Sequence, residues 1–203
     1  GLMSGNRQVK SWQEAAAPVD FYTIKGVVDT LMASYNLQEA VAYQATDAYP
    51  EMHPGRTAAI YVGETFIGIV GQIHPKIAKA THLKETYIFE LDLAKILELQ
   101  RQTIIAKPAP KFPEVTRDIA LQVPEAVTNA ELVNAIKEKG GRYLVSVSLF
   151  DVYAGSHIEA GEKSMAYTLT YLNEDATLTE EEVNAAFEKV VAHLVATFQA
   201  KVR

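Results

Sequence analysis

The sequence has no cysteine among its 203 residues. This absence excludes disulfides, thiol nucleophiles, iron–sulfur clusters and thiolate zinc sites, and it is typical of a reducing compartment. No uncharged apolar run approaches the ~18 residues that a membrane span needs, and the chain does not start with a signal-peptide pattern. With 48% hydrophobic residues, 11 glycines and 8 prolines, the composition is that of a globular protein. We therefore expect a folded cytoplasmic protein without a membrane anchor.

Familiar catalytic motifs are missing as well. The sequence has no Gly-x-x-x-x-Gly-Lys-Ser/Thr phosphate loop, no Gly-x-Gly-x-x-Gly fingerprint and no Gly-x-Ser-x-Gly nucleophile elbow. His53 and His74 each precede a proline, and we interpret them as hydrogen-bonded turn histidines; a metal site built from both and a carboxylate is the less favoured alternative. We interpret the run Glu180-Glu181-Glu182 as the first turn of a helix whose dipole it offsets. The sequence thus predicts no catalytic, metal or cofactor residue.

The charge balance is acidic, with a formal net charge of −6. Residues 108–203 carry 9 basic and 14 acidic residues, so this half alone has a net charge of −5. Proteins that are held to nucleic acid mainly by phosphate contacts usually show a basic face. Tight, independent binding of RNA or DNA by this chain is therefore not expected, although one local contact surface within a larger assembly is compatible with the composition.

Prolines mark a boundary in the middle of the chain. Pro108, Pro110 and Pro113 fall within six residues, where they remove backbone donors and favour extended backbone. We place a linker near residues 101–113, and predict one domain at residues 1–107 and a second at 108–203.

The second half is predicted to alternate strands and helices in the order strand, helix, strand, strand, helix, strand. Strands are expected at 115–123 and 163–172, where apolar and polar residues alternate, and at 144–153. The tail at 198–203 is long enough for one last short strand. Thr128 with Glu131, and Thr179 with Glu182, have the spacing of capping boxes at the starts of two helices. Two matching strand–helix–strand halves are typical of a ferredoxin-like βαββαβ domain.

The first half is predicted to be an α+β unit built on an antiparallel sheet. Asp20 is placed to cap a helix that continues to about Tyr35. Strands are expected at 41–46, 57–62, 65–72 and 87–93, with Gly63-Glu64 as a two-residue hairpin turn, and a short helix is expected at 75–81. No repeat with a fixed period of 20–50 residues is present.

Many short motifs, taken in order, resemble the C-terminal part of the bacterial phenylalanyl-tRNA synthetase beta subunit. In the first half they are Val19-Asp20-Phe21-Tyr22, His53-Pro54-Gly55-Arg56-x-Ala58, Gly68-Ile69-Val70-Gly71-Gln72-Ile73-His74-Pro75 and Phe89-Glu90-Leu91-Asp92. In the second half they are Phe112-Pro113-x-Val115-x-Arg117-Asp118-Ile119-Ala120, Leu149-Phe150-Asp151-Val152-Tyr153-x-Gly155, Lys163-Ser164-x-Ala166 and Thr177-Leu178-Thr179-x-Glu181-x-Val183. The similarity covers nearly the whole chain.

The resemblance implies a fold, partners and a role. It implies a partial class II synthetase-like domain without catalysis, followed by a ferredoxin-fold anticodon-binding domain. The partners it implies are tRNA(Phe) and a catalytic alpha subunit, in a heterotetramer of two alpha and two beta chains. The whole synthetase would use ATP and Mg²⁺, whereas this fragment would bind no cofactor. In agreement, the sequence lacks the Phe/Tyr-Arg-x-Glu stretch and the Gly-rich stretch ending in Glu-Arg with which class II sites bind ATP.

Six residues of the second half are candidates for contact with tRNA. They are Lys111, Arg117, Arg142, Phe150, Tyr153 and Lys163. Tyr167 and Tyr171 share a strand face with Met165 and Leu169 and should be buried, which leaves Phe150 as the one large aromatic expected on the opposite face. A broad base-stacking platform is therefore poorly supported, and contact through edges, loops or the connection at 153–163 is favoured.

Two other classes of function are open from the sequence. Ferredoxin-like units also serve as small-molecule-sensing or protein-interaction modules. A sensing module would have a ligand pocket where two sheets pair, and a thermal shift with amino acids but not with tRNA. An enzyme with its own active site would need titratable groups converging in a cleft, and no constellation in the sequence suggests one.

Overall fold

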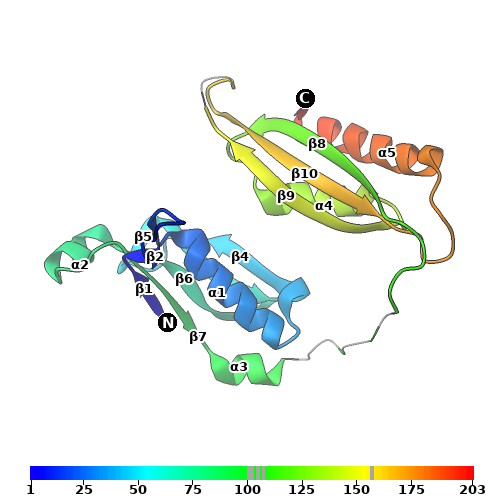
Figure 1. Ribbon diagram of the computed structural model, residues 1–203. Helices are drawn as coiled ribbons and strands as arrows, with labels where there is room; N and C mark the ends of the chain where they lie inside the picture. Colours follow the sequence, from blue (N-terminus) through cyan, green and yellow to red (C-terminus); the bar gives the residue numbers. More distant parts are fainter. Residues whose placement is uncertain (100–102, 104–105, 107, 156–157) are drawn as a thin grey trace. The chain divides into compact units, whose positions relative to one another are not determined.

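The computed structural model describes residues 1–99, 103, 106, 108–155 and 158–203. It divides into two compact units, residues 1–106 and 107–203, which are called the first and the second unit below. Of the linker expected near residues 101–113, residues 101, 102, 104, 105 and 107 lie outside the described residues; residues 108–110 have no regular structure. Figure 1 shows the helices and strands of both units.

The first unit is a five-stranded antiparallel sheet in the order β1-β7-β6-β5-β4. The strands are β1 (Leu2–Ser4), β4 (Val41–Ala45), β5 (Met52–Val62), β6 (Thr65–Ile73) and β7 (Thr86–Leu91). Helix α1 (Phe21–Ser34) packs on it, and its buried residues Ile24, Val28 and Met32 join the sheet residues Ile60 and Val70 in one core. The predicted α+β unit with an antiparallel sheet is confirmed.

The start of α1 follows the sequence signal closely. The carboxylate of Asp20 accepts a hydrogen bond from the amide of Thr23 at 2.7 Å, and the Thr23 hydroxyl accepts in return from the Asp20 amide. The hydrogen bond from the Thr23 side chain is the main reason why the pKa of Asp20 lies below its ordinary value. These two hydrogen bonds pair backbone amides that would otherwise be left without a partner at the start of a helix. They therefore fix the residue at which α1 begins.

Two strand boundaries in the first unit differ from the prediction by two residues or more. Strand β5 begins at Met52 rather than at residue 57, and a shift of register between Met52 and Thr57 accommodates Pro54. Strand β7 ends at Leu91, and Leu93 is instead the first residue of a helix, α3 (Leu93–Glu98), whose N-cap is Asp92. The remaining short elements are β2 (Asn6–Gln8), β3 (Ala17–Pro18), a 3₁₀ turn (Gln38–Ala40) and α2 (Pro75–Ala80).

The second unit is a four-stranded antiparallel sheet in the order β11-β8-β10-β9, which is the ferredoxin-like order. The strands are β8 (Val115–Pro124), β9 (Leu144–Tyr153), β10 (Glu162–Tyr171) and β11 (Lys201–Val202), and the helices are α4 (Asn129–Lys139) and α5 (Glu180–Phe198). Both predicted capping boxes, Thr128 with Glu131 and Thr179 with Glu182, are present. Helix α5 extends to Phe198, so the last strand is shorter than the stretch predicted for it.

One sheet face of the second unit carries the core. Met165, Tyr167, Leu169 and Tyr171 of β10 are 0–3% exposed and pack with residues of α4 and α5, as the alternation in the sequence predicts. The hydroxyl of Tyr167 reaches the start of α4, where it donates a hydrogen bond to the side-chain oxygen of Asn129 at 2.9 Å. The helices thus cover this face, which leaves the other face of the sheet open (Figure 1).

Candidate nucleic-acid interface

The open face of the second sheet is formed mainly by small and polar side chains. Strand alternation, starting from the buried residues, assigns side chains to it from three neighbouring strands. They are Asp118, Ala120 and Gln122 of β8, Ser164, Ala166, Thr168 and Thr170 of β10, and Ser146, Ser148, Phe150, Asp151 and Tyr153 of β9. Short side chains in the middle of the sheet leave room for a flat group to lie on the strands.

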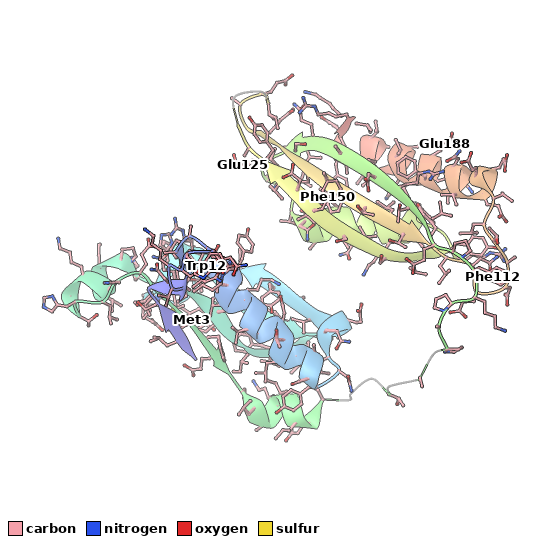
Figure 2. The ribbon with its side chains drawn as sticks, viewed as in Figure 1. Met3, Trp12, Phe112, Glu125, Phe150 and Glu188 are labelled. Atoms are coloured by element: carbon pink, nitrogen blue, oxygen red, sulfur yellow. The ribbon has the colours of Figure 1, made fainter. Side chains whose placement is uncertain are left out.

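Two exposed aromatics rise from β9 on this face. Leu149 pairs with Tyr167 and packs against the core, while Asp151 pairs with Ala166, so Phe150 is the extra residue of a β-bulge. Phe150 is 57% exposed and Tyr153, paired with Ser164, is 39% exposed; Figure 2 labels Phe150 on β9. The bulge shifts the alternation by one residue, and this shift brings Tyr153 to the same face as Phe150.

The charged groups of the open face are mostly acidic. Asp118 accepts a hydrogen bond from the Thr168 hydroxyl at 2.6 Å, and Asp151 is exposed beside Phe150. The Lys201 ammonium of β11 donates to the carboxylates of Glu159, at 2.9 Å, and Glu162, at 3.2 Å. Such a surface is suited to stacking and to hydrogen bonds with base edges rather than to phosphate contact.

Arg117 points to the helix-covered face of the sheet, away from the open face. It pairs with Leu169, whose side chain is fully buried, and its guanidinium donates to the side-chain oxygen of Asn184 in α5 at 3.2 and 3.4 Å. A third hydrogen bond, 3.0 Å long, joins it to the carbonyl of Thr116. These contacts link β8 to α5 and give Arg117 a structural role.

Lys163 also points to the helix side of the sheet. It pairs with Val123, which is fully buried, and its charge contributes to the lowered pKa of Glu131, whose main causes are hydrogen bonds from the backbone and hydroxyl of Thr128. Lys163 therefore lies near the start of α4 and on the opposite face from Phe150 and Tyr153.

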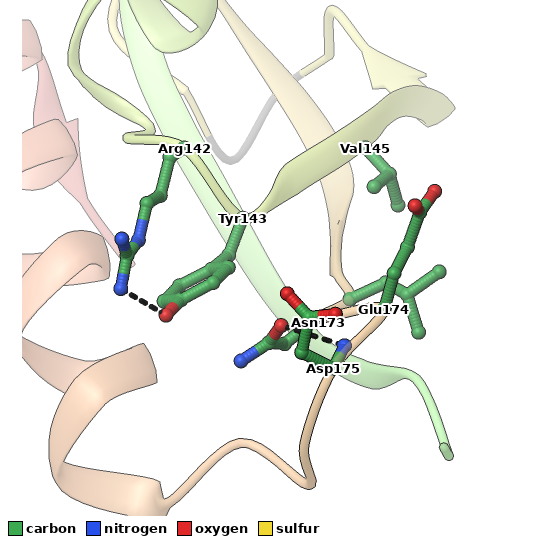
Figure 3. A pocket seen from close by; sticks show the side chains of 7 residues that line it. Arg142, Tyr143, Val145, Asn173, Glu174 and Asp175 are labelled. Carbon is green, nitrogen blue, oxygen red and sulfur yellow. Dashed lines mark hydrogen bonds between the residues drawn. The ribbon is translucent and has the colours of Figure 1, made fainter. Parts of the chain in front are cut away.

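Arg142 lies at the end of the sheet where β9 begins. Its guanidinium stacks on the ring of Tyr143, with 4.4 Å between Cζ and the ring centroid, and donates to the Tyr143 hydroxyl. Figure 3 shows both beside a hollow of about 540 Å³ whose rim also carries Asn173, Glu174 and Asp175. Lys111, exposed in the loop before β8, completes the six candidates. The mixed charges give this hollow no clear preference for an anion.

The six candidates therefore do not form one site. Phe150 and Tyr153 share the open face, Arg117 and Lys163 lie on the other face, and Arg142 and Lys111 belong to loops. Asp118 and Asp151 belong to the open face but were not among the candidates, although the alternation around Ile119 placed Asp118 there. The assignment of Asp151 required the bulge, which the sequence does not show.

The histidines behave as the turn interpretation expects. Nδ1 of His53 accepts a hydrogen bond from the Gly55 amide at 3.0 Å, and Nδ1 of His74 accepts from the Lys76 amide at 3.1 Å at the start of α2. In the part of the chain that the structure describes, no three His, Asp or Glu side chains gather as metal ligands would. The three glutamates at 180–182 occupy the first turn of α5. Among the described helices, none is both long and apolar enough to span a membrane.

The first unit has an apolar sheet face of its own. On the side opposite α1, alternation places Ala59, Tyr61, Phe66, Ile69 and Ile88, together with the exposed polar residues Gln44 and Glu90. The rings of Tyr61 and Phe66 meet edge to face, with centroids 5.6 Å apart, and both are only partly buried. A surface of this kind is suited to packing against another polypeptide.

Comparison with known proteins assigns both units. Residues 1–93 match the family model of the phenylalanyl tRNA synthetase beta chain CLM domain, and residues 110–203 match that of the ferredoxin-fold anticodon binding domain. The chain is 98% identical to the phenylalanine–tRNA ligase beta subunit of Latilactobacillus sakei, 50% to that of Lactiplantibacillus plantarum and 42% to that of Bacillus subtilis. Each match covers the whole chain but only 25% of the relative's length.

Proposed function

Because the chain belongs to the phenylalanine–tRNA ligase beta-subunit family, we propose that its second unit binds the anticodon region of tRNA(Phe) and that its first unit packs against the catalytic alpha subunit. The observation that carries the first part is the open sheet face, where Phe150 and Tyr153 stand exposed beside small residues and two carboxylates. Aromatic rings of this kind stack with unpaired bases, and carboxylates accept hydrogen bonds from base amino groups. An anticodon loop offers both.

The same surface predicts weak binding by the chain alone. The second half has a net charge of −5, so few released counterions favour the complex. We propose that affinity in the ligase comes from linking this unit to other tRNA contacts, which raises the effective concentration. Titrating the chain with tRNA(Phe) should give a Kd above roughly 1 μM at physiological salt, some 4 kcal/mol or more short of a nanomolar complex. Sub-micromolar binding that persists at this salt would contradict the proposal.

The apolar face opposite α1 supports the second part of the proposal. Tyr61, Phe66, Ile69 and Ile88 form a partly exposed strip on an otherwise regular sheet, as an interface between subunits requires. The alpha subunit is the partner we propose for it, in an assembly of two alpha and two beta chains. ATP and Mg²⁺ would be bound by the alpha subunit, since the present chain lacks the class II motifs for ATP. The assembly would work in the cytoplasm.

Removing the second unit should separate the two roles. Co-expressing the alpha subunit with a beta subunit that lacks residues 108–203 should leave phenylalanyl-adenylate formation unchanged, because that chemistry occurs elsewhere in the assembly. Aminoacylation should fall on the order of 100-fold, since a linked tRNA contact is lost. Both rates can be followed with labelled phenylalanine, using the intact pair of subunits as the control. Aminoacylation at the intact rate would exclude a role of the second unit in tRNA binding.

A further inference from the structure

The last strand of the chain is tied to the connection between β9 and β10 by one side chain. Strand β11 pairs with β8 so that Lys201 lies opposite Gln122. From there the Lys201 ammonium donates to Glu159, in the connection, at 2.9 Å, and to Glu162, at the start of β10, at 3.2 and 3.4 Å. The Gln122 side chain donates to the same Glu162 carboxylate. Four side chains from β8, β10, β11 and the connection thus form one network.

The backbone on both sides of Lys201 is well anchored. Ala200 is only 4% exposed and belongs to the core, and the amide of Arg203 donates to the Ala120 carbonyl at 3.0 Å. Lys201 therefore extends from a fixed strand. Glu159, in contrast, is exposed, as are its described neighbours Ala160 and Gly161, so the ion pair holds residues 158–161 of the connection to the strand rather than the reverse.

The charge of Lys201 is already neutralised by its neighbours. Two carboxylates contact one ammonium, so the trio has a net charge of −1. Hydrogen bonds to Glu159 and Glu162 raise the pKa of Lys201 above its ordinary value, and those from Gln122 and Lys201 lower the pKa of Glu162. An ammonium held in this way is a poor partner for an RNA phosphate, which would have to displace a carboxylate.

The connection held by Lys201 follows directly after Tyr153. Its described part is closed by two hydrogen bonds between backbone groups, from the Ile158 amide to the Gly155 carbonyl and from the Glu162 amide to the Glu159 carbonyl, each 3.1 Å long. A side chain at Gly155 would collide with the Tyr153 ring, because an added Cβ would lie within 3.0 Å of three ring and hydroxyl atoms. The backbone of the connection thus limits the positions available to Tyr153.

We propose that Lys201 is a positioning residue for RNA binding. It holds residues 158–161 of the β9–β10 connection to β11 and, through the hydrogen bond from Ile158 to Gly155, limits the position of Tyr153 without contacting the RNA. The proposal rests on the proposed function of the open face. The charge of Lys201 alone would suggest a different role, in which this lysine contacts a phosphate of the RNA.

The two roles of Lys201 predict different salt dependences. For Lys201→Met, the positioning role predicts three- to tenfold weaker binding of the tRNA(Phe) anticodon stem-loop, with the same slope of log K against log salt as the unchanged chain. Lys201→Arg should restore most of the affinity, because a guanidinium can also bridge both carboxylates. A phosphate contact would instead make the slope shallower by about 0.7, the single-strand value for one released counterion. That shallower slope would overturn the proposal.

A measurement on the free protein tests the positioning without RNA. Amide exchange at Ile158 and Glu162 should become at least threefold faster in Lys201→Met and in Glu159→Gln, because each variant breaks the same contact. The double variant Lys201→Glu with Glu159→Lys exchanges the two charges. It should return amide exchange at Ile158 and Glu162 toward the original rate. Lys189→Met removes the same charge from the exposed side of α5 and should change neither exchange nor binding. Unchanged exchange in Lys201→Met would refute the positioning role, whereas faster exchange in a chain that binds no stem-loop would refute only the proposed function.

Discussion

Replacing Phe150 and Tyr153 together by alanine should weaken binding of the tRNA(Phe) anticodon stem-loop by about 100-fold, and each single replacement by about tenfold, since stacking of one base on an aromatic ring contributes about 1–3 kcal/mol. Both rings are exposed on one sheet face, so neither change removes a core contact. Chemical-shift titration of the labelled chain at low salt can measure the weak complexes that result.

The strand itself supplies the control for this prediction. Val152 lies between the two aromatics in β9 and is 53% exposed, but it pairs with Met165 and therefore points to the helix side of the sheet. Val152→Ala removes apolar surface from the same strand and should leave the stem-loop affinity within twofold. If Val152→Ala weakens binding as much as Phe150→Ala does, the RNA is not on the open face.

Much of the second unit could be predicted because its signals are local. Thr128 and Thr179 stand three residues before the glutamates that complete their capping boxes, so each helix start is encoded within four residues. The alternation in β10 likewise identified the buried face, since its apolar residues all point to the helices. Here local preference and global packing agree, and a sequence is then easily interpreted.

The missed elements depend on partners far away in the chain. Strand β1 has three residues and exists because Leu2 pairs with Ile88, a contact that no local pattern shows. Strand β5 passes through Pro54 because a shift of register absorbs the proline, whereas proline in a strand normally predicts its end. Helix α3 is the exception, because it has a local signal: the Asp92 carboxylate accepts from the Lys95 amide at 3.1 Å.

The candidate site was only partly accessible from the sequence for a similar reason. Arg117 has the same parity as the buried Ile119, and Lys163 the same as Met165, so alternation alone could have excluded both from the open face. Tyr153 is different. Uninterrupted alternation from Leu149 would turn it toward the helices, and only the bulge at Phe150 brings it to the open face. A bulge is set by pairing with β10 and has no reliable local signature.

Substituting Gly68 by alanine should destabilise the first unit by about 3 kcal/mol or more, through overpacking and an unfavourable backbone conformation. Gly68 lies in β6 with a φ of +154°, and an added Cβ would come within 2.0 Å of the Glu90 carbonyl oxygen. That oxygen belongs to the backbone of the neighbouring strand β7, where Leu91 pairs with Gly68. Relief would require β6 and β7 to separate in the middle of the sheet.

Helix α1 offers a matched glycine where the same change should act in the opposite direction. Gly26 lies within α1, and a Cβ there would meet no heavy atom within 4 Å among its described surroundings. Alanine loses less conformational freedom on helix formation, so Gly26→Ala should stabilise the unit by about 0.5–1 kcal/mol. Amide exchange at Ile60 and Val70, two buried residues of the first unit, reports its unfolding in both variants. Equal protection in Gly68→Ala and the unchanged chain would mean that β6 and β7 can yield at this point, and the close approach of their backbones would then contribute little to the stability of the sheet.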